Sequence, residues 1–217
     1  MLKSLYPLIN WDIVQIVGFD LDGTLYDEMD FIVQVYKPIS EIMAKLCNSP
    51  AERIFIWMLQ RWLEMGSSYN RIFSDVLNNH GIHGDVANSI VAECLSLYRG
   101  YKPLINLPIR VSVILDYIKK SHDLFLISDG HEFLQMEKFK VLGLERWIRH
   151  NNFGVSGFHG PDFAKPSTKI LDKISLLRTC SLPKSVVYFG DRDIDSQFAT
   201  AAGFQFVRVN GLIPTTT

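Results

Sequence analysis

Two aspartates separated by one residue, Asp20 and Asp22, are the most informative feature of this 217-residue chain. They follow the apolar and β-branched run Ile13–Phe19 and precede Gly23. Such a run predicts a buried strand that delivers both carboxylates to its carboxyl end, where open α/β sheets bind ligands. Because two carboxylates this close repel each other, a proton, a cation or nearby donors must offset their charge. One aspartate can act as a nucleophile and the other as a general acid and base.

Two further polar groups are expected at the same edge of the sheet. Ser128-Asp129-Gly130 ends a second predicted strand, Leu124–Ile127. A serine hydroxyl with the backbone N–H groups of a helix start makes a cradle for an anion. Lys165 precedes another predicted helix, where its ammonium group is placed to reach the same anion.

A third predicted strand, Val186–Phe189, ends near Asp191, and Asp195 follows at the opening of the next helix. Several carboxylate oxygens without a set of His and Cys ligands favour Mg²⁺ over zinc. Such an ion beside an anion cradle and a nucleophilic carboxylate indicates phosphoryl transfer. Asp191 and Asp195 are also suited to capping the helix, a role compatible with metal binding. Asp193 is interpreted as a structural or solvated acid.

The elements that position these groups alternate between strands and helices. A fourth apolar run, Phe204–Val209, is expected to be a strand, and Gly203 before it to be a helix C-cap. This alternation predicts an α/β fold with a doubly wound parallel sheet. Amphipathic helices are expected over Ile109–Lys120, Pro166–Arg178 and Asp195–Ala202.

The segment 27–103 interrupts that alternation with a series of helical patterns. Pro38 is expected to kink or interrupt the first of them. We therefore predict an α/β core domain of residues 1–26 and 104–217, with an all-helical cap domain of residues 27–103 inserted after the first strand. The four helical stretches are Phe31–Leu46, Pro50–Met65, Tyr69–Asn79 and Asp85–Tyr98.

Composition restricts the class of protein. The chain is 47% hydrophobic, which is ample for a packed core, and 22 basic residues against 23 acidic ones give a net charge of −1. A balanced charge without a basic cluster predicts no nucleic-acid or membrane-surface partner. Three widely spaced cysteines, Cys47, Cys94 and Cys180, form no disulfide pattern and favour a cytoplasmic setting. The sequence makes no prediction of the oligomeric state.

With these residues in place, the chain resembles the haloacid dehalogenase (HAD) superfamily, in its phosphatase branch with a helical cap after the first motif. The resemblance covers about residues 13–26 and 104–209, whereas the cap matches only in position and helical character. All four family motifs are present in order, at Asp20–Leu25, Ile127–Gly130, Lys165–Pro166 and Gly190–Asp195.

The resemblance implies a catalytic role for each of the first two aspartates. Asp20 would be the nucleophile that forms an aspartyl-phosphate, and Asp22 would protonate the leaving alcohol and then activate water. Asp20, the backbone carbonyl of Asp22, and Asp191 would bind Mg²⁺. Asp195 would bind the metal through water or orient its neighbours.

The resemblance also implies a substrate site lined by Thr24, Ser128, Asp129, Gly130 and Lys165. Ser128 and Lys165 would hold the transferring phosphoryl group, and Thr24 would brace the loop around Asp22. Asp129 stands where many relatives carry Asn. We expect its carboxylate to point away from the phosphate and leave the backbone N–H groups as donors.

The expected function is therefore a Mg²⁺-dependent phosphatase that hydrolyses a small phosphate monoester, either a sugar phosphate or a nucleoside monophosphate. A phosphomutase on the same core and a catalytically silent binding or regulatory protein are the alternatives. A dehalogenase is disfavoured, because dehalogenation does not need the acid and base that Asp22 supplies. Intact Asp20, Asp22, Lys165 and Asp191 disfavour the silent protein.

Overall fold

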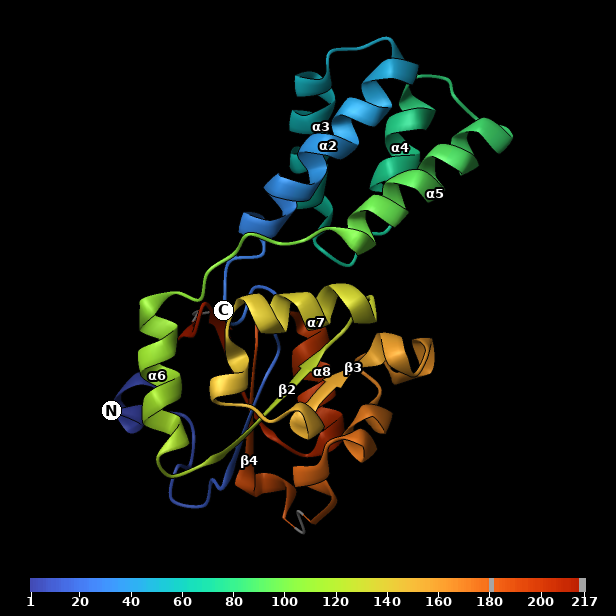
Figure 1. Ribbon diagram of the computed structural model, residues 1–217. Helices are drawn as coiled ribbons and strands as arrows, with labels where there is room; N and C mark the ends of the chain where they lie inside the picture. The colour runs from blue at the N-terminus through green and yellow to red at the C-terminus, as the bar shows by residue number, and fades with distance from the viewer. Residues whose placement is uncertain (180–181, 215–217) are drawn as a thin grey trace. The chain divides into compact units, whose positions relative to one another are not determined.

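A computed structural model describes residues 1–179 and 182–214. It divides into two compact units, one formed by Met1–Glu28 with the chain from Ile105 onward, and one formed by Met29–Leu104 (Figure 1). Cys47 and Cys94 are buried and free, and Cys180 lies outside the described residues.

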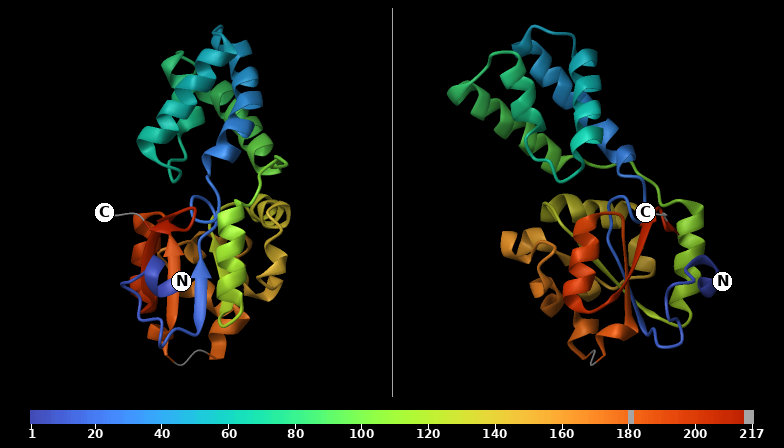
Figure 2. Two further views of the ribbon diagram at one scale, coloured as in Figure 1. Left: turned by 90° about the vertical axis from the view of Figure 1, so that its left-hand side faces the viewer. Right: turned by 180° about the vertical axis from the view of Figure 1, so that it is seen from behind.

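The first unit is built on a six-stranded sheet in the order β3-β2-β1-β4-β5-β6. Five strands are parallel, and β6 pairs antiparallel with β5. Helices flank the sheet on both faces (Figure 2), so the predicted doubly wound α/β fold is confirmed. The strands are β1 (Ile16–Phe19), β2 (Asp123–Ser128), β3 (Phe153–Val155), β4 (Val186–Gly190), β5 (Gln205–Asn210) and β6 (Ile213–Pro214).

Two of these strands, β3 and β6, were not expected from the sequence. They contain three and two residues, which is too short for a run of apolar residues to be recognised. In β3 the middle residue is Gly154, on which Ile170 and Ile174 pack: a Cβ atom there would lie 2.9 Å from Cδ1 of Ile174 and 3.0 Å from Cγ1 of Ile170. Close packing from outside the strand therefore selects a residue of low intrinsic strand propensity.

Strand β1 is central and pairs with β2 on one side and with β4 on the other. Phe19 is in register with Leu126 of β2 and Phe189 of β4, and the N–H of Asp20 donates to the carbonyl oxygen of Phe189 at 2.8 Å. The loops after β1, β2 and β4 therefore open at one edge of the sheet. The strand order changes direction at β1, which is where open α/β sheets bind ligands.

The helices of this unit are α1 (Leu2–Leu5), α6 (Ile109–Lys119), α7 (Glu132–Val141) and α8 (Asp193–Ala202). The expected helices Ile109–Lys120 and Asp195–Ala202 are confirmed within two residues. Gly203 ends α8 with a left-handed conformation at φ 74°, as its C-cap position predicts.

The prediction of a helix over Pro166–Arg178 was wrong. The segment forms two short 3₁₀ helices, Thr168–Lys173 and Ser175–Thr179, separated by an extended Ile174. Ile170 and Ile174 are both fully buried against β3. The extended backbone at Ile174 allows both side chains to face the strand. Tertiary packing thus overrides the helical pattern of the segment.

The second unit consists of four helices, as the sequence predicted: α2 (Met29–Cys47), α3 (Ala51–Met65), α4 (Ile72–Asn79) and α5 (Gly84–Gly100). Its interior is aromatic: Phe31 meets Tyr98 edge to face at 5.5 Å, and Tyr36 meets Phe73 at 5.9 Å between ring centroids. The Gln34 side chain exchanges two hydrogen bonds with the backbone of Leu104, each 3.0 Å long, which fixes the end of the unit to α2.

Helix α2 continues through Pro38, so of the two expected outcomes, a kink or an interruption, the interruption does not occur. A proline inside a helix costs about 3 kcal/mol. The side chains on either side of it, Val35, Tyr36 and Ile39, are buried, and each contributes about 1.5–3 kcal/mol when removed from water. Burial of this face offsets the lost hydrogen bond.

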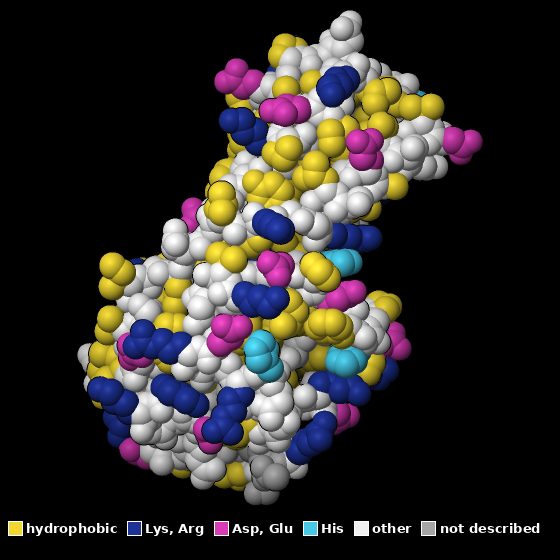
Figure 3. All heavy atoms as spheres, in the orientation of Figure 1, with side chains coloured by type: hydrophobic (Ala, Val, Ile, Leu, Met, Phe, Trp, Pro, Cys, Tyr) yellow, Lys and Arg dark blue, Asp and Glu magenta, His cyan; other side chains and the backbone are white. Residues whose placement is uncertain are grey.

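The surface carries both signs of charge. On the face shown in Figure 3, basic side chains over the first unit are interspersed with acidic ones. Exposed ion pairs such as Arg146–Asp116 at 2.9 Å and Lys169–Asp162 at 3.5 Å are part of this pattern. Among the described residues, no helix combines the length and the apolar character needed to cross a membrane.

Packing at the centre of the sheet generates a stability prediction. A Cβ atom at Gly18 of β1 would lie 2.1 Å from Cζ of Phe125, a ring that is fully buried. We expect Gly18→Ala to lower the free energy of unfolding by about 1–3 kcal/mol through overpacking, measured by urea denaturation followed by circular dichroism. The control is Gly100→Ala, where a Cβ atom meets nothing within 4 Å. Equal midpoints for the two variants would contradict the prediction.

Candidate active site

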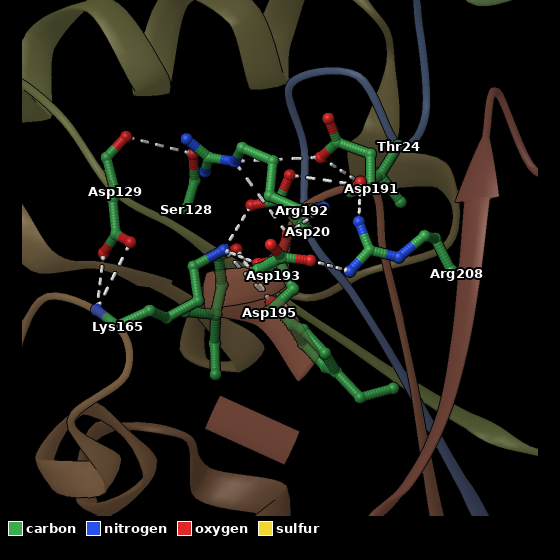
Figure 4. A network of polar contacts seen from close by, with 12 residues as sticks. Asp20, Thr24, Ser128, Asp129, Lys165, Asp191, Arg192, Asp193, Asp195 and Arg208 are labelled. Atoms are coloured by element: carbon green, nitrogen blue, oxygen red, sulfur yellow. Dashed lines mark hydrogen bonds and ion pairs between the residues drawn. The ribbon is translucent and has the colours of Figure 1, made fainter. Parts of the chain in front are cut away.

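The centre of the site is the ammonium group of Lys165, which lies between two carboxylates (Figure 4). Its Nζ donates to Oδ1 of Asp20 at 2.5 Å and to Oδ1 of Asp195 at 2.6 Å. All three side chains are at least 98% buried. They come from the end of β1, the loop before the 3₁₀ helix Thr168–Lys173, and the first turn of α8, so this contact joins three parts of the unit.

Asp195 performs two roles at once. Its Oδ2 accepts a hydrogen bond from the backbone N–H of Arg192 at 3.1 Å, which caps the start of α8, while its Oδ1 faces Lys165. The helix-capping role considered for this residue is therefore compatible with its contact to Lys165. Because the helix start carries a partial positive charge, it also stabilises the carboxylate.

Asp191 completes a cluster of three acids. One carboxylate oxygen from each of Asp20, Asp191 and Asp195 lies within 4.8 Å of the others. Gly23 makes room for this cluster, since a Cβ atom there would lie 2.4 Å from Oδ2 of Asp191, and its φ of 79° favours glycine. Among the described residues, this group consists of carboxylates alone, and such an oxygen donor set is of the kind that hard divalent cations prefer.

Burial is the largest influence on the pKa values of Asp20 and Asp191 in the cluster. Burial raises the pKa of Asp20 well above its usual value, although the charge of Lys165 opposes this and that of Asp195 adds to it. Burial likewise raises the pKa of Asp191 to about 6, against the opposing charge of Arg192. For Lys165, burial lowers the pKa, but the charges of Asp20 and Asp195 outweigh burial and raise it well above its usual range.

The neighbours of the cluster hold it in place. Thr24 donates its hydroxyl to Oδ2 of Asp20 at 3.3 Å and lies 3.5 Å from Oδ1 of Asp191. Asp193, which the sequence suggested is a structural or solvated acid, is exposed and pairs with Arg208. Arg208 also donates to the carbonyl oxygen of Asp191 at 2.9 Å, so this pair fixes the backbone after β4.

The loop after β2 carries Ser128, Asp129 and Gly130. Ser128 is buried, and Gly130 has a φ of 125°. The Asp129 carboxylate accepts from the backbone N–H of Lys165, 3.3 Å from each oxygen. This contact directs the carboxylate to the neighbouring loop and couples that loop to the position of Lys165.

Asp22 has a separate set of partners that the sequence analysis missed. Lys138 Nζ donates to its Oδ1 at 2.5 Å, Gln135 Nε2 donates to its Oδ2 at 3.2 Å, and the Tyr26 hydroxyl also donates to Oδ1. Burial raises the pKa of Asp22, but the charge of Lys138 and these hydrogen bonds lower it more, so the pKa lies below its usual value. Burial together with the charge of Asp22 raises the pKa of nearby Glu28 to about 7.

A sequence signal for these partners exists but is weak. Gln135 and Lys138 are three residues apart on α7, which places them on one face, beside the buried Leu134 and Phe139. A polar pair on the apolar face of a helix suggests a buried polar partner. It does not say which one, because Asp22 is 116 residues from Lys138 in the chain.

Comparison with known proteins identifies the family. The family model for haloacid dehalogenase-like hydrolases matches residues 17–209, which is most of the chain. The chain belongs to this family. The resemblance inferred from the four motifs is therefore confirmed, and so is the expectation that the protein is a hydrolase of this kind.

Proteins that are similar to this chain carry different names. The glyceraldehyde 3-phosphate phosphatase of Methanothermobacter thermautotrophicus is 27% identical over 198 residues, covering 89% of this chain and 84% of that protein. A HAD-superfamily hydrolase of subfamily IA from Geobacter sulfurreducens has a TM-score of 0.67 at 18% identity, covering 90% of this chain and 87% of the other. A Thermotoga maritima protein provisionally named beta-phosphoglucomutase has a TM-score of 0.63 at 20% identity, covering 90% of this chain and 85% of the other.

The buried ion pairs of Lys165 generate a stability prediction. Lys165→Met leaves two buried carboxylates without their shared cation, and we expect the free energy of unfolding in EDTA to fall by about 3–5 kcal/mol. Urea denaturation at neutral pH measures this. Lys169→Met is the matched control, because Lys169 and its partner Asp162 are both exposed and such a pair contributes at most about 1 kcal/mol. Equal losses in the two variants would contradict a special role for the buried pairs.

Proposed function

We propose that this hydrolase is a Mg²⁺-dependent phosphatase that cleaves a small phosphate monoester through an aspartyl-phosphate on Asp20. The observation that carries the proposal is the cluster of Asp20, Asp191 and Asp195, two of which, Asp20 and Asp195, pair with one buried lysine. A carboxylate nucleophile, a fixed cation and an oxygen donor set together suit phosphoryl transfer, in which charge on the transferring group must be stabilised.

In the first step, a carboxylate oxygen of Asp20 attacks phosphorus, and the bond from phosphorus to the alcohol oxygen breaks. Lys165 and Ser128 hold the phosphoryl oxygens, and the loop after β2, which includes Gly130, contributes backbone N–H groups. Asp22 gives a proton to the departing oxygen. Lys165 limits the repulsion between Asp20 and the anionic substrate, since its ammonium group lies 2.5 Å from the carboxylate.

In the second step, Asp22 as a carboxylate takes a proton from water, whose oxygen attacks the aspartyl-phosphate. Inorganic phosphate leaves, and the carboxylate of Asp20 is regenerated. Lys138 and the hydrogen bonds to Asp22 favour its charged form, which is the form that accepts a proton in this step. Thr24 and Asp129 have supporting roles through their contacts with Asp20 and with the Lys165 backbone.

The residues present fit a magnesium ion. Carboxylate oxygens of Asp20, Asp191 and Asp195 lie close enough to share one cation, and a divalent cation there would offset the cost of burying these carboxylates in their charged form. The backbone carbonyl of Asp22 is a further proposed ligand. When bound, Mg²⁺ would neutralise charge on the phosphoryl oxygens and orient the group.

The substrate class and the domain roles are part of the proposal. A relative named glyceraldehyde 3-phosphate phosphatase supports a small phosphorylated metabolite, with sugar phosphates and nucleoside monophosphates as the classes to test. We propose that residues 27–103 form a cap domain that sets specificity, and that residues 1–26 and 104–217 form the catalytic domain. A cytoplasmic location agrees with the cysteine content and with substrates of this kind.

The direct test is phosphate release from a panel of substrates. The panel contains glyceraldehyde 3-phosphate, sugar phosphates and nucleoside monophosphates, each assayed with Mg²⁺ or with EDTA. We expect release that needs Mg²⁺ and that falls by at least about 10³-fold in Asp20→Asn, which lacks the nucleophile. Asp162→Asn, which alters an exposed acid, is the matched control.

Other outcomes distinguish the alternatives. Product formation that depends on a sugar bisphosphate activator, without stoichiometric phosphate release, would identify a phosphomutase. Absence of release from every substrate by folded protein with Mg²⁺ would overturn the phosphatase proposal. Equal activity of Asp20→Asn and the parent chain would exclude Asp20 as the nucleophile.

Gly23 provides an independent test of the metal site. In Gly23→Ala the new methyl group displaces Asp191, so we expect the Mg²⁺ concentration for half-maximal activity to rise by about tenfold or more, equivalent to about 1.4 kcal/mol. Gly143→Ala is the matched control, because Gly143 also has positive φ, at 64°, but open space around it. An unchanged Mg²⁺ requirement in Gly23→Ala would remove Asp191 from the metal ligands.

A further inference from the structure

The carboxylate of Asp22 is held by donors on both of its oxygens. Lys138 Nζ and the Tyr26 hydroxyl contact Oδ1, and Gln135 Nε2 contacts Oδ2. Asp22 lies in the loop after β1, next to Gly23, where the backbone alone does not fix a side chain. The direction of this carboxylate is therefore set by its partners, two of which come from α7.

Lys138 is an unusual residue for its position. Only 1% of it is exposed, and it lies on the same helix face as the apolar side chains of Leu134 and Phe139, which are also buried. Lysine is rarely fully buried unless it is paired. Its ammonium group is 2.5 Å from Asp22 and 5.8 Å from the centre of the Tyr26 ring. The long stem thus carries one positive charge through the protein interior to this carboxylate.

Gln135 links Asp22 to the loop after β2. Its Nε2 donates to Oδ2 of Asp22 at 3.2 Å and to the carbonyl oxygen of Asp129 at 3.1 Å. Both contacted atoms are acceptors, so this orientation of the amide is the one that chemistry requires. The Asp129 carboxylate in turn accepts from the backbone of Lys165. Gln135 therefore connects Asp22 to the loops that carry Ser128 and Lys165.

We propose that Lys138 and Gln135 are positioning residues, which hold the Asp22 carboxylate in the orientation needed to exchange protons with the leaving alcohol and with water. The inference rests on the proposed phosphatase function. A general acid and base must lie within about 2.6–3.2 Å of the atom it serves, so a carboxylate free to rotate loses catalytic efficiency. Helix α7 acts through Asp22 and does not itself touch the reacting atoms.

The test uses the dependence of kcat/KM on the leaving group. p-Nitrophenolate leaves readily without a proton, whereas an alkoxide needs one. Mispositioning of Asp22 should therefore slow alkyl phosphates far more than p-nitrophenyl phosphate. For Lys138→Met we expect kcat/KM to fall about 10²-fold on the best alkyl phosphate of the panel and less than about tenfold on p-nitrophenyl phosphate. A purely structural defect would lower both values by the same factor.

Two further variants and a control make the test independent of one substitution. Lys138→Arg retains a charged donor, and we expect it to recover part of the loss. Gln135→Met removes one donor to Asp22 and leaves no buried charge unpaired. We expect kcat/KM on the alkyl phosphate to fall several-fold more than kcat/KM on p-nitrophenyl phosphate, a smaller difference than in Lys138→Met. Lys140→Met is the matched control on α7, because Lys140 is exposed and pairs with Glu137.

The outcomes separate the inference from the function on which it rests. If the parent chain with Mg²⁺ hydrolyses neither substrate, the proposed function fails. If the parent chain is active but folded Lys138→Met loses equal factors on both substrates, or none on either, the positioning role is overturned. If Lys138→Met does not fold, Gln135→Met decides: equal factors on both substrates, or none on either, overturn the proposal.

Discussion

The rest of the site depends on the two ion pairs that the ammonium group of Lys165 makes with Asp20 and Asp195. The ammonium group is fully buried between Asp20 and Asp195, and these residues come from β1 and α8, which are distant in the chain. Without this charge, two buried carboxylates would repel each other across the sheet edge, at a cost far above that of an exposed ion pair. These two ion pairs therefore hold the proposed site together and contribute to folding stability.

The two aspartates of the first motif lie one residue apart but in different electrostatic surroundings. Burial and neighbouring acids raise the pKa of Asp20, whereas Lys138 and three hydrogen bonds lower that of Asp22. Each aspartate therefore has its own buried lysine. Environments that move the pKa values of paired acids apart are how enzymes assign different tasks to chemically identical groups.

The fold alone does not select the reaction. Proteins with this architecture carry the names of hydrolases and of a mutase, at 18–20% identity and TM-scores of 0.63–0.67. Function must therefore be argued from the site. Under the proposed function, the contacts of Asp22 separate this site from that of a dehalogenase, because cleavage of a phosphate ester needs a proton donor and acceptor and dehalogenation does not.

The sequence by itself determined the parallel sheet, the inserted helices and the motif residues from Asp20 to Asp195. These follow from local patterns: apolar runs such as Ile13–Phe19, and acids placed directly after them. Only the tertiary structure decided the extended break at Ile174, the short strand β3, and the partners of Asp22. The physical reason is the same in each case. Packing on Gly154 and the pairing of Lys138 with a residue 116 positions away are long-range contacts, which no local periodicity encodes.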